Sequence, residues 1–168
     1  MTTGELRENI ILDTNKKITS EALQAFSALK LFPPGTLLVA MYGATIGRLA
    51  ILGIHATTNQ ACCALVNSSV FETRFIFYWF QAFKEFVILL ATGGGQPNIS
   101  QDKIRSLKIA SPSFHEQQAI TDYLDKETAK IDSLIEKEQA IIGKLKEYRL
   151  ALISEVVTGK IDVRGEAS

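Results

Sequence analysis

The residues that most often carry chemistry are few in this chain, and their spacing matches no common catalytic motif. The two histidines, His55 and His115, have no cysteine at a spacing typical of zinc ligands. Thr158, Gly159 and Lys160 resemble the end of a phosphate-binding loop, but Ile161 follows where that motif needs a hydroxyl to ligate magnesium. We therefore expect each histidine to be a surface or hydrogen-bonded side chain, and we expect no metal and no cofactor.

The two cysteines are adjacent, Cys62 and Cys63, and stand inside an apolar run with no base nearby in sequence. Adjacent cysteines cannot staple a disulfide framework, which indicates a reducing, cytoplasmic location. We expect both to be small core side chains instead of nucleophiles. The chain also lacks the Asn-Pro-Pro-Tyr-like stretch with which amino-methyltransferases hold a flipped base. These absences predict that the chain is not an enzyme on its own.

A set of polar side chains beside glycine-rich loops indicates a different role. Asn and Gln can form paired hydrogen bonds with adenine, and Arg can bind guanine or phosphate, so the set suits the reading of duplex DNA. The side chains that we expect near DNA are Tyr42, Thr45, Arg48, Asn59, Gln60, Gln96 and Asn98. The alternative is that the asparagines and Gln60 simply bond their own turns.

Three short apolar runs are expected to position these loops. They cover residues 36–41, 48–54 and 60–66, with tight connections that favour strands of an antiparallel or mixed sheet. Two glycines, Gly43 and Gly47, surround Thr45 in a loop that a ligand can approach closely.

Helical and further strand patterns surround these runs. Residues 20–30 have helical spacing, and residues 71–90 read as one helix whose aromatic residues pack a core. A short helical turn around residues 102–104 and a last strand at 107–110 are expected before Pro112 ends the first domain. The predicted fold class is α+β, with a small mixed or antiparallel sheet followed by one long C-terminal helix of coiled-coil type.

The long helix is predicted over residues 113–157. Ser113 and Glu116 can form a capping box at its start, and Gly159 follows its end. A helix of this length is on the order of 65 Å long, so part of its apolar face needs a partner. The face follows a heptad pattern. Its residues, which we expect to contact a partner helix, are Ile120, Leu124, Ile131, Leu134, Ile141, Leu145, Tyr148 and Leu152.

The charge of the chain is balanced overall but uneven along its length. The formal net charge is zero. Residues 1–112 hold ten Lys and Arg against seven Asp and Glu, whereas residues 113–168 hold eight against eleven. A polyanion would therefore favour the first part of the chain.

Several short motifs, in order, resemble one protein family. They are the run from Gly35 to Gly47, Asn59-Gln60-Ala61, Gly94-Gly-Gln-Pro-Asn-Ile99, Pro112 with Glu116-Gln117, Ile131-Asp132, Tyr148-Arg149 and Val157-Thr-Gly-Lys-Ile161. Together they resemble the DNA-specificity subunit of type I restriction-modification systems, from about Ile18 to Arg164. The resemblance implies a target recognition domain that docks in the DNA groove, followed by a long helix. It also implies that catalysis belongs to the partner methyltransferase (modification) and restriction subunits.

The chain departs from the family pattern in two ways. The family has two recognition domains and two helices, whereas this sequence has one of each, so it resembles a half-subunit. The family also has further strands ahead of the part that corresponds to Ile18. We therefore expect an N-terminally incomplete recognition domain at 1–112, a spacer and dimerisation helix at 113–157, and a tail at 158–168.

Two functions are compatible with this organisation. In the first, the chain pairs through its helix with another copy or another specificity subunit and reads a bipartite DNA site. In the second, it no longer binds DNA and regulates assembly by binding the methyltransferase or another specificity subunit. Three acids, Glu127, Glu138 and Glu155, fall on the apolar face, where they would either fix the register of a helix pair or face basic residues of a partner.

Overall fold

The computed structural model describes residues 1–93 and 97–165. The chain forms two compact units, and the first ends at Thr121. No helix of the described residues is long and apolar enough to cross a membrane.

The first unit is built on a four-stranded sheet. Its strands are β1 (Asn9–Ile11), β2 (Leu37–Ala40), β3 (Leu49–Leu52) and β4 (Cys62–Leu65), in the order β1-β3-β2-β4. Strand β2 pairs antiparallel with both β3 and β4, whereas β1 pairs parallel with β3. The sheet is therefore mixed, and the three strands expected from apolar runs are present.

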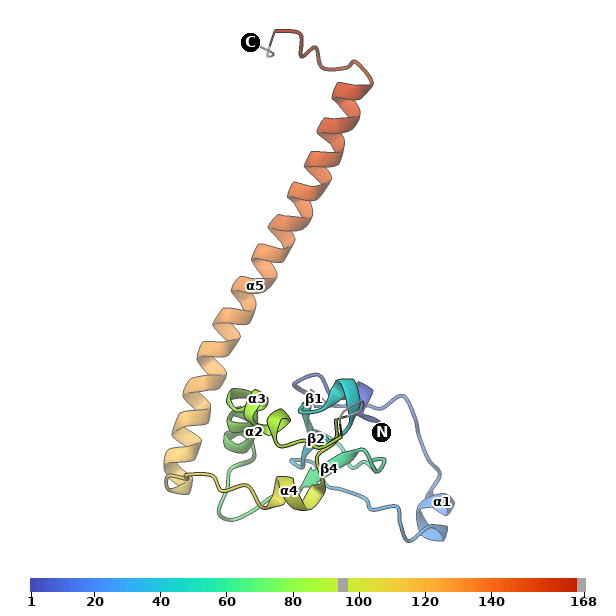
Figure 1. Cartoon of the computed structure of the whole chain (residues 1–168), viewed down its shortest axis with the longest axis vertical. Helices are drawn as coiled ribbons and strands as arrows, with labels where there is room; N and C mark the ends of the chain where they lie inside the picture. Colours follow the sequence, from blue (N-terminus) through green and yellow to red (C-terminus); the bar gives the residue numbers. More distant parts are fainter. Residues whose placement is uncertain (94–96, 166–168) are drawn as a thin grey trace. The chain divides into compact units, whose positions relative to one another are not determined.

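The helices complete an α+β fold, as expected. The short 3-10 helices are η1 (Thr3–Glu5) and η2 (Gly43–Thr45), and the α-helices are α1 (Ser20–Ala25), α2 (Thr73–Ala82), α3 (Lys84–Leu89), α4 (Gln101–Arg105) and α5 (Phe114–Val157). In Figure 1, α2 and α3 lie side by side next to the sheet. The long C-terminal helix is confirmed, with 44 residues in α5.

Two expectations about these elements were wrong, and one strand was not predicted. The single helix over residues 71–90 is two helices, because Phe83 leaves helical geometry with φ −105° and ψ 22°. Phe83 is 48% exposed, its ring centroid lies 4.9 Å from that of Trp79, and Phe86 is also exposed. Strand β1 was missed because its three residues are too short a run to recognise.

The strand expected at 107–110 is absent, since that segment has no regular structure. Its alternating apolar side chains, Leu107 and Ile109, are half-buried against the core all the same. Burial of alternate residues therefore produced a strand-like pattern without any strand pairing.

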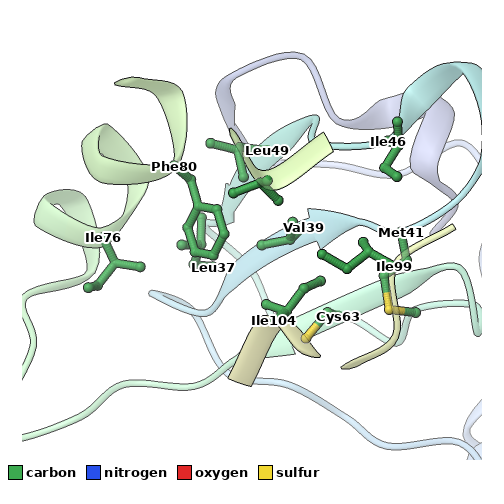
Figure 2. Close-up of a cluster of buried hydrophobic side chains, with 11 residues drawn as sticks. Leu37, Val39, Met41, Ile46, Leu49, Cys63, Ile76, Phe80, Ile99 and Ile104 are labelled. Carbon is green, nitrogen blue, oxygen red and sulfur yellow. The ribbon is translucent and has the colours of Figure 1, made fainter. Parts of the chain in front are cut away.

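Alternate residues of the sheet build two cores. On one face, Leu37, Val39 and Met41 of the β2 segment belong to one core cluster with Ile76 and Phe80 of α2 (Figure 2). All four residues of β2 are buried, so the strand is covered on both faces. This explains why β2 reads as a continuous apolar run instead of an alternating one.

The opposite face of the sheet carries mostly small side chains. Ala40, Ala50 and Ala64 lie there and are buried against Met1 and Leu6 of the N-terminal segment. Small residues let the N-terminal segment, with its short 3-10 helix η1, approach the strands closely.

Helix α5 begins and ends where its sequence predicts. The Ser113 backbone N–H donates to Glu116 Oε2 at 2.9 Å, and the Glu116 N–H donates to Ser113 Oγ at 3.4 Å, which completes the capping box. The Ser113 hydroxyl also donates to Glu116 Oε2 at 2.6 Å, and this bond, followed by the one from the Ser113 N–H, lowers the pKa of the Glu116 carboxyl. After Val157, Gly159 takes a φ of +74°, and the Lys160 N–H donates to the Glu155 carbonyl at 2.8 Å.

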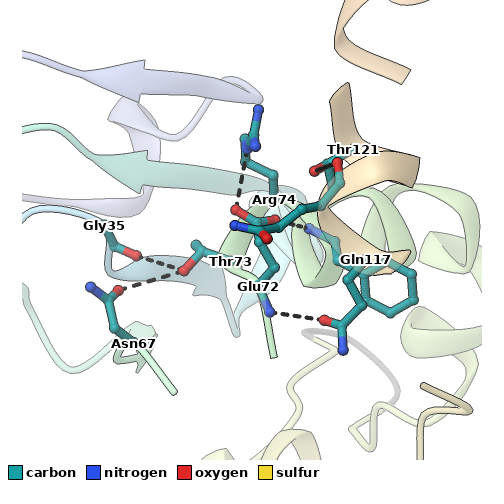
Figure 3. A network of polar contacts seen from close by, with 9 residues as sticks. Gly35, Asn67, Glu72, Thr73, Arg74, Gln117 and Thr121 are labelled. Atoms are coloured by element: carbon teal, nitrogen blue, oxygen red, sulfur yellow. Dashed lines mark hydrogen bonds and ion pairs between the residues drawn. The ribbon is translucent and has the colours of Figure 1, made fainter. Parts of the chain in front are cut away.

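The side chain of Gln117 ties the first turns of α5 to the domain that precedes it. It is fully buried. Its Oε1 accepts from the Glu72 N–H at 2.9 Å, where α2 begins (Figure 3). Its Nε2 donates to the Val70 carbonyl at 2.9 Å, to Ser111 Oγ at 2.8 Å and to the Pro112 carbonyl at 3.1 Å. One amide thus joins two segments that lie 45 residues apart.

We predict that Gln117→Ala lowers the free energy of unfolding by about 3 kcal/mol, because buried partners such as the Glu72 N–H and the Val70 carbonyl lose their hydrogen bonds. Urea unfolding followed by circular dichroism measures this loss. The exposed neighbour Gln118 gives a matched control, since Gln118→Ala should change stability by no more than about 0.5 kcal/mol. Equal stability of both variants would contradict the role of Gln117.

The cysteines give a second prediction. Both are buried, and burial raises the pKa of the Cys62 thiol from 9.0 to about 11 and also raises the pKa of Cys63. At pH 8 a disulfide reagent should therefore react with neither thiol until the protein unfolds in urea. Between pH 9 and pH 11 the unfolded Cys62 thiol ionises first, so stability should fall as pH rises. Immediate reaction of the folded protein with the disulfide reagent would show that at least one of the two thiols is not buried.

Candidate nucleic-acid interface

The residues expected near DNA gather at one end of the sheet because of how the strands pair. Tyr42 follows the C-terminal end of β2, and Arg48 precedes β3. Asn59 and Gln60 precede β4. Since β2 is antiparallel to both neighbours, its C-terminal end lies beside the N-terminal ends of β3 and β4.

A third segment is held at the same end by backbone hydrogen bonds. The Gly43 N–H donates to the Pro97 carbonyl at 2.9 Å, and the Ile99 N–H donates to the Met41 carbonyl at 3.0 Å. Tyr42 and Asn98 face each other across an antiparallel bridge. Loops that are more than 50 residues apart in sequence are therefore joined, and Asn98 lies beside Tyr42.

The side chains in this group differ in how exposed they are to solvent. Tyr42 is 45% exposed and Gln60 is exposed, whereas Arg48 and Asn98 are half-buried. Thr45 Oγ1 donates to the Tyr42 carbonyl at 3.1 Å, within its own turn. Gln96, also expected in this set, lies outside the described residues.

Asn59 is the candidate with the most structural contacts. Its Oδ1 accepts from Cys62 Sγ at 3.6 Å, and its carbonyl accepts from the Cys62 N–H at 3.2 Å. Its own N–H donates to the Met1 carbonyl at 3.1 Å. The two bonds to Cys62 lie within the turn of Asn59, as expected if Asn59 has a structural role in its own turn.

Two charged residues at this end were not found from the sequence. Lys84 of α3 lies over the loop, since a Cβ on Gly47 would meet Lys84 Cγ at 3.4 Å. Its Nζ is 4.0 Å from Oε1 of Glu8, which precedes β1. Glu8 has a φ of +55°, unusual for a residue with a side chain, and its N–H donates to the Leu49 carbonyl at 2.8 Å. No local pattern marks either residue, because the pairing of β1 with β3 brings Glu8 here and the packing of α3 against Gly47 brings Lys84.

The residues considered for catalysis lie elsewhere or are inaccessible. His55 and His115 are exposed, and the two cysteines are buried. Within residues 1–93 and 97–165, no group of three or more His, Cys, Asp or Glu side chains is arranged to hold a metal ion.

The apolar face of α5 is open over most of its length. Six of the expected contact residues are between 41% and 67% exposed: Ile131, Leu134, Ile141, Leu145, Tyr148 and Leu152. Ile120 is 39% exposed and Leu124 is half-buried. Glu127, on the same face, pairs with Lys130 at 2.7 Å within the helix.

Comparisons with known proteins agree on one family. Residues 2–144 match the family described as type I restriction modification DNA specificity domain. The chain is 29% identical over 135 residues to the type I restriction enzyme MjaIX specificity subunit of Methanocaldococcus jannaschii, covering 77% of this chain and 30% of that protein. It is 26% identical over 161 residues to the putative MjaX specificity subunit of the same organism, covering 96% of this chain and 34% of that protein.

A solved structure has the same fold. It comes from work on complex assembly and conformational transition of the type I R-M system, with a TM-score of 0.67 and 18% identity over 75% of this chain and 31% of that one. The chain thus spans about a third of the length of the relatives it matches. Because the family match covers most of the sequence, the chain belongs to the family of type I restriction-modification DNA specificity domains.

Proposed function

We propose that this chain is the DNA-recognition half of a type I specificity subunit. It reads one part of a bipartite target in double-stranded DNA and positions methyltransferase and restriction subunits there, while it catalyses no reaction itself. The observation that carries this proposal is the gathering of Tyr42, Arg48, Gln60 and Asn98 from three segments at one end of the sheet.

The chemistry of this end suits a duplex. Amide side chains such as Gln60 and Asn98 can form paired bonds with adenine, and Arg48 and Lys84 can approach phosphates. Positive charge is in excess in residues 1–112, which favours a polyanion on this part of the chain. The negative charge of Glu8 repels DNA phosphates and partly neutralises the positive charge of Lys84, so it lowers the net positive charge of this surface.

The second part of the proposal concerns α5. Two copies, or one copy and another specificity subunit, pair through the face from Ile120 to Leu152. Exposure of that face supports this, since large apolar surfaces on a helix usually meet a partner. A pair with two-fold symmetry would read an inverted bipartite site, and the helices would set the distance between its halves.

For the DNA interface we predict that Arg48→Ala weakens binding to a mixed-sequence duplex and lowers the salt slope by about 1, because one phosphate contact is lost. Glu8→Gln should strengthen binding, because it removes a negative charge beside Lys84. Fluorescence anisotropy over a series of salt concentrations measures both effects.

The matched control is Lys17→Ala, which removes an exposed positive charge beyond the opposite end of β1 and should leave DNA affinity unchanged. An equal loss of DNA affinity in the Lys17 and Arg48 variants would mean that binding depends on overall charge and not on the end of the sheet that carries Arg48. If a duplex is not shifted in a gel at low salt, with or without a methyltransferase subunit, the chain is instead a DNA-silent adaptor that acts through its helix.

For the helix we predict that Leu134→Asp raises the dissociation constant of the pair on the order of 100-fold, because a charge would be buried between apolar faces. Ser133→Asp adds the same charge one residue away, off the apolar face, and should have little effect. Light scattering over a range of concentrations measures association. A wild-type monomer with a folded helix and no binding to a methyltransferase subunit would refute the pairing proposal.

A further inference from the structure

Three side chains from different segments form one row at the end of the sheet proposed for DNA. Asn98 lies opposite Tyr42 in one antiparallel bridge and opposite Thr92 in another. The Thr92 N–H donates to the Asn98 carbonyl at 2.8 Å, and the Asn98 N–H donates to the Thr92 carbonyl at 2.8 Å. Residues directly opposite each other in antiparallel pairing project from the same face. The order across this face is therefore Thr92, Asn98, Tyr42, which we name the Thr-Asn-Tyr row.

The Thr-Asn-Tyr row points away from the hydrophobic core. Met41 and Ile99 are 2% exposed and belong to the core cluster (Figure 2), and Ala91 packs against it. Each of these three residues is the chain neighbour of one residue of the row. Because side chains alternate along an extended chain, the row projects in the opposite direction. Its two outer side chains are exposed, and the central one is half-buried.

The polar side-chain groups of the row make no hydrogen bonds inside the part of the chain that the structure describes. This holds for the amide of Asn98 and for the hydroxyls of Thr92 and Tyr42. Asn59 differs, since its amide oxygen accepts from Cys62 Sγ at 3.6 Å. The backbone N–H and carbonyl of Asn98 are both bonded to Thr92, so its amide is the group that can bind a ligand.

The chemistry of the row suits the edge of a base pair. The row carries no charge, so it adds nothing to the attraction of phosphates that Arg48 and Lys84 provide. An amide side chain can form two hydrogen bonds with adenine, at N6 and N7, and an apolar surface can pack against the methyl group of thymine. The row is about 10 Å across at its Cα atoms, which fits a major groove about 12 Å wide.

We propose that the Thr-Asn-Tyr row reads one A·T base pair from the major groove. Asn98 Nδ2 donates to N7 of the adenine, and Asn98 Oδ1 accepts from N6. On one side the Tyr42 ring packs against the methyl group of the paired thymine, and on the other side the Thr92 hydroxyl bonds the next base of the adenine strand. This reading of a base pair rests on the proposed DNA-recognition function. It adds Thr92, for which the sequence predicts no role, to the residues that determine specificity.

The test starts from the whole chain and a library of random-sequence duplexes, from which the bound duplexes are selected at low salt, with and without a type I methyltransferase subunit. In the selected duplex each adenine in turn is replaced by 7-deazaadenine, which lacks N7, and each thymine by uracil, which lacks the methyl group. One 7-deazaadenine should weaken wild-type binding about tenfold, since it breaks a paired contact. Uracil opposite that adenine should weaken binding about threefold, since one buried methyl group is lost.

Substitutions in the row should remove these sensitivities. Asn98→Ala should bind the selected duplex about tenfold more weakly than the wild type and should no longer respond to the 7-deazaadenine. Tyr42→Ala should no longer respond to the uracil, and Thr92→Val should weaken binding about threefold because one hydroxyl is lost. Gln24→Ala is the matched control, because it removes an exposed amide on α1 and should keep the affinity and both sensitivities.

Circular dichroism checks that the variants are folded. If Asn98→Ala is not folded, Asn98→Asp replaces it; this variant keeps the shape of the side chain, cannot donate to N7, and should also lose the response to 7-deazaadenine.

The outcomes separate this inference from the proposed function. If no duplex binds, with or without the methyltransferase subunit, the proposed function fails and the reading of a base pair fails with it. If duplexes bind but the wild type and Asn98→Ala respond equally to every 7-deazaadenine, DNA recognition stands and only the reading of a base pair is refuted. Wild-type behaviour of both Tyr42→Ala and Thr92→Val would refute the row, because Asn98 would then act alone.

Discussion

The pairing of β2 on both of its edges is the constraint on which the first unit depends. Because β2 is antiparallel to β3 and β4, the loop after β2 and the loop before β4 must emerge at one end of the sheet. The alternation of its four buried residues also fixes the two cores, with Leu37 and Val39 on one face and Leu38 and Ala40 on the other. A shift of one residue in this register would exchange the side chains on the two faces and place the small residues against α2. The register therefore positions the loops and the cores together.

Much of this arrangement could be predicted from the sequence, and the exceptions have physical causes. The segments that form β2, β3 and β4 are apolar and bounded by glycine or polar turns. The capping box at the start of α5 and the glycine after its end can both be recognised in the sequence. Strand β1 could not be found, because three residues have no recognisable period and their pairing with β3 is non-local. The break at Phe83 was hidden for a related reason: aromatic residues continue through it, and only packing decides which of them is buried. Glu8 and Lys84 reach the loop end through tertiary contacts alone.

Helix α5 combines two different environments along one continuous element. Its first turns are fixed by Gln117, whose amide is saturated with hydrogen bonds inside the first unit. From Ile131 onward the expected contact residues are exposed, and in the proposed pair the acids on the same face would lower the affinity for a uniform coiled coil. Glu127 is compensated by Lys130 of the same helix, but an exposed pair of this kind contributes little stability. The helix is therefore better suited to selecting a partner with matching charges than to closing tightly on any apolar helix.

Strand β4 is held near both of its ends by side-chain contacts as well as by its pairing with β2. Where the strand begins, Asn59 Oδ1 accepts from Cys62 Sγ at 3.6 Å. Near its end, Arg105 Nη2 donates to the Ala64 carbonyl at 3.2 Å. The strand has only four residues, and the first three are buried, so these contacts fix the turn before it relative to the sheet. The position of Gln60, which is proposed to face DNA, therefore depends on packing inside the first unit and not on its own loop alone.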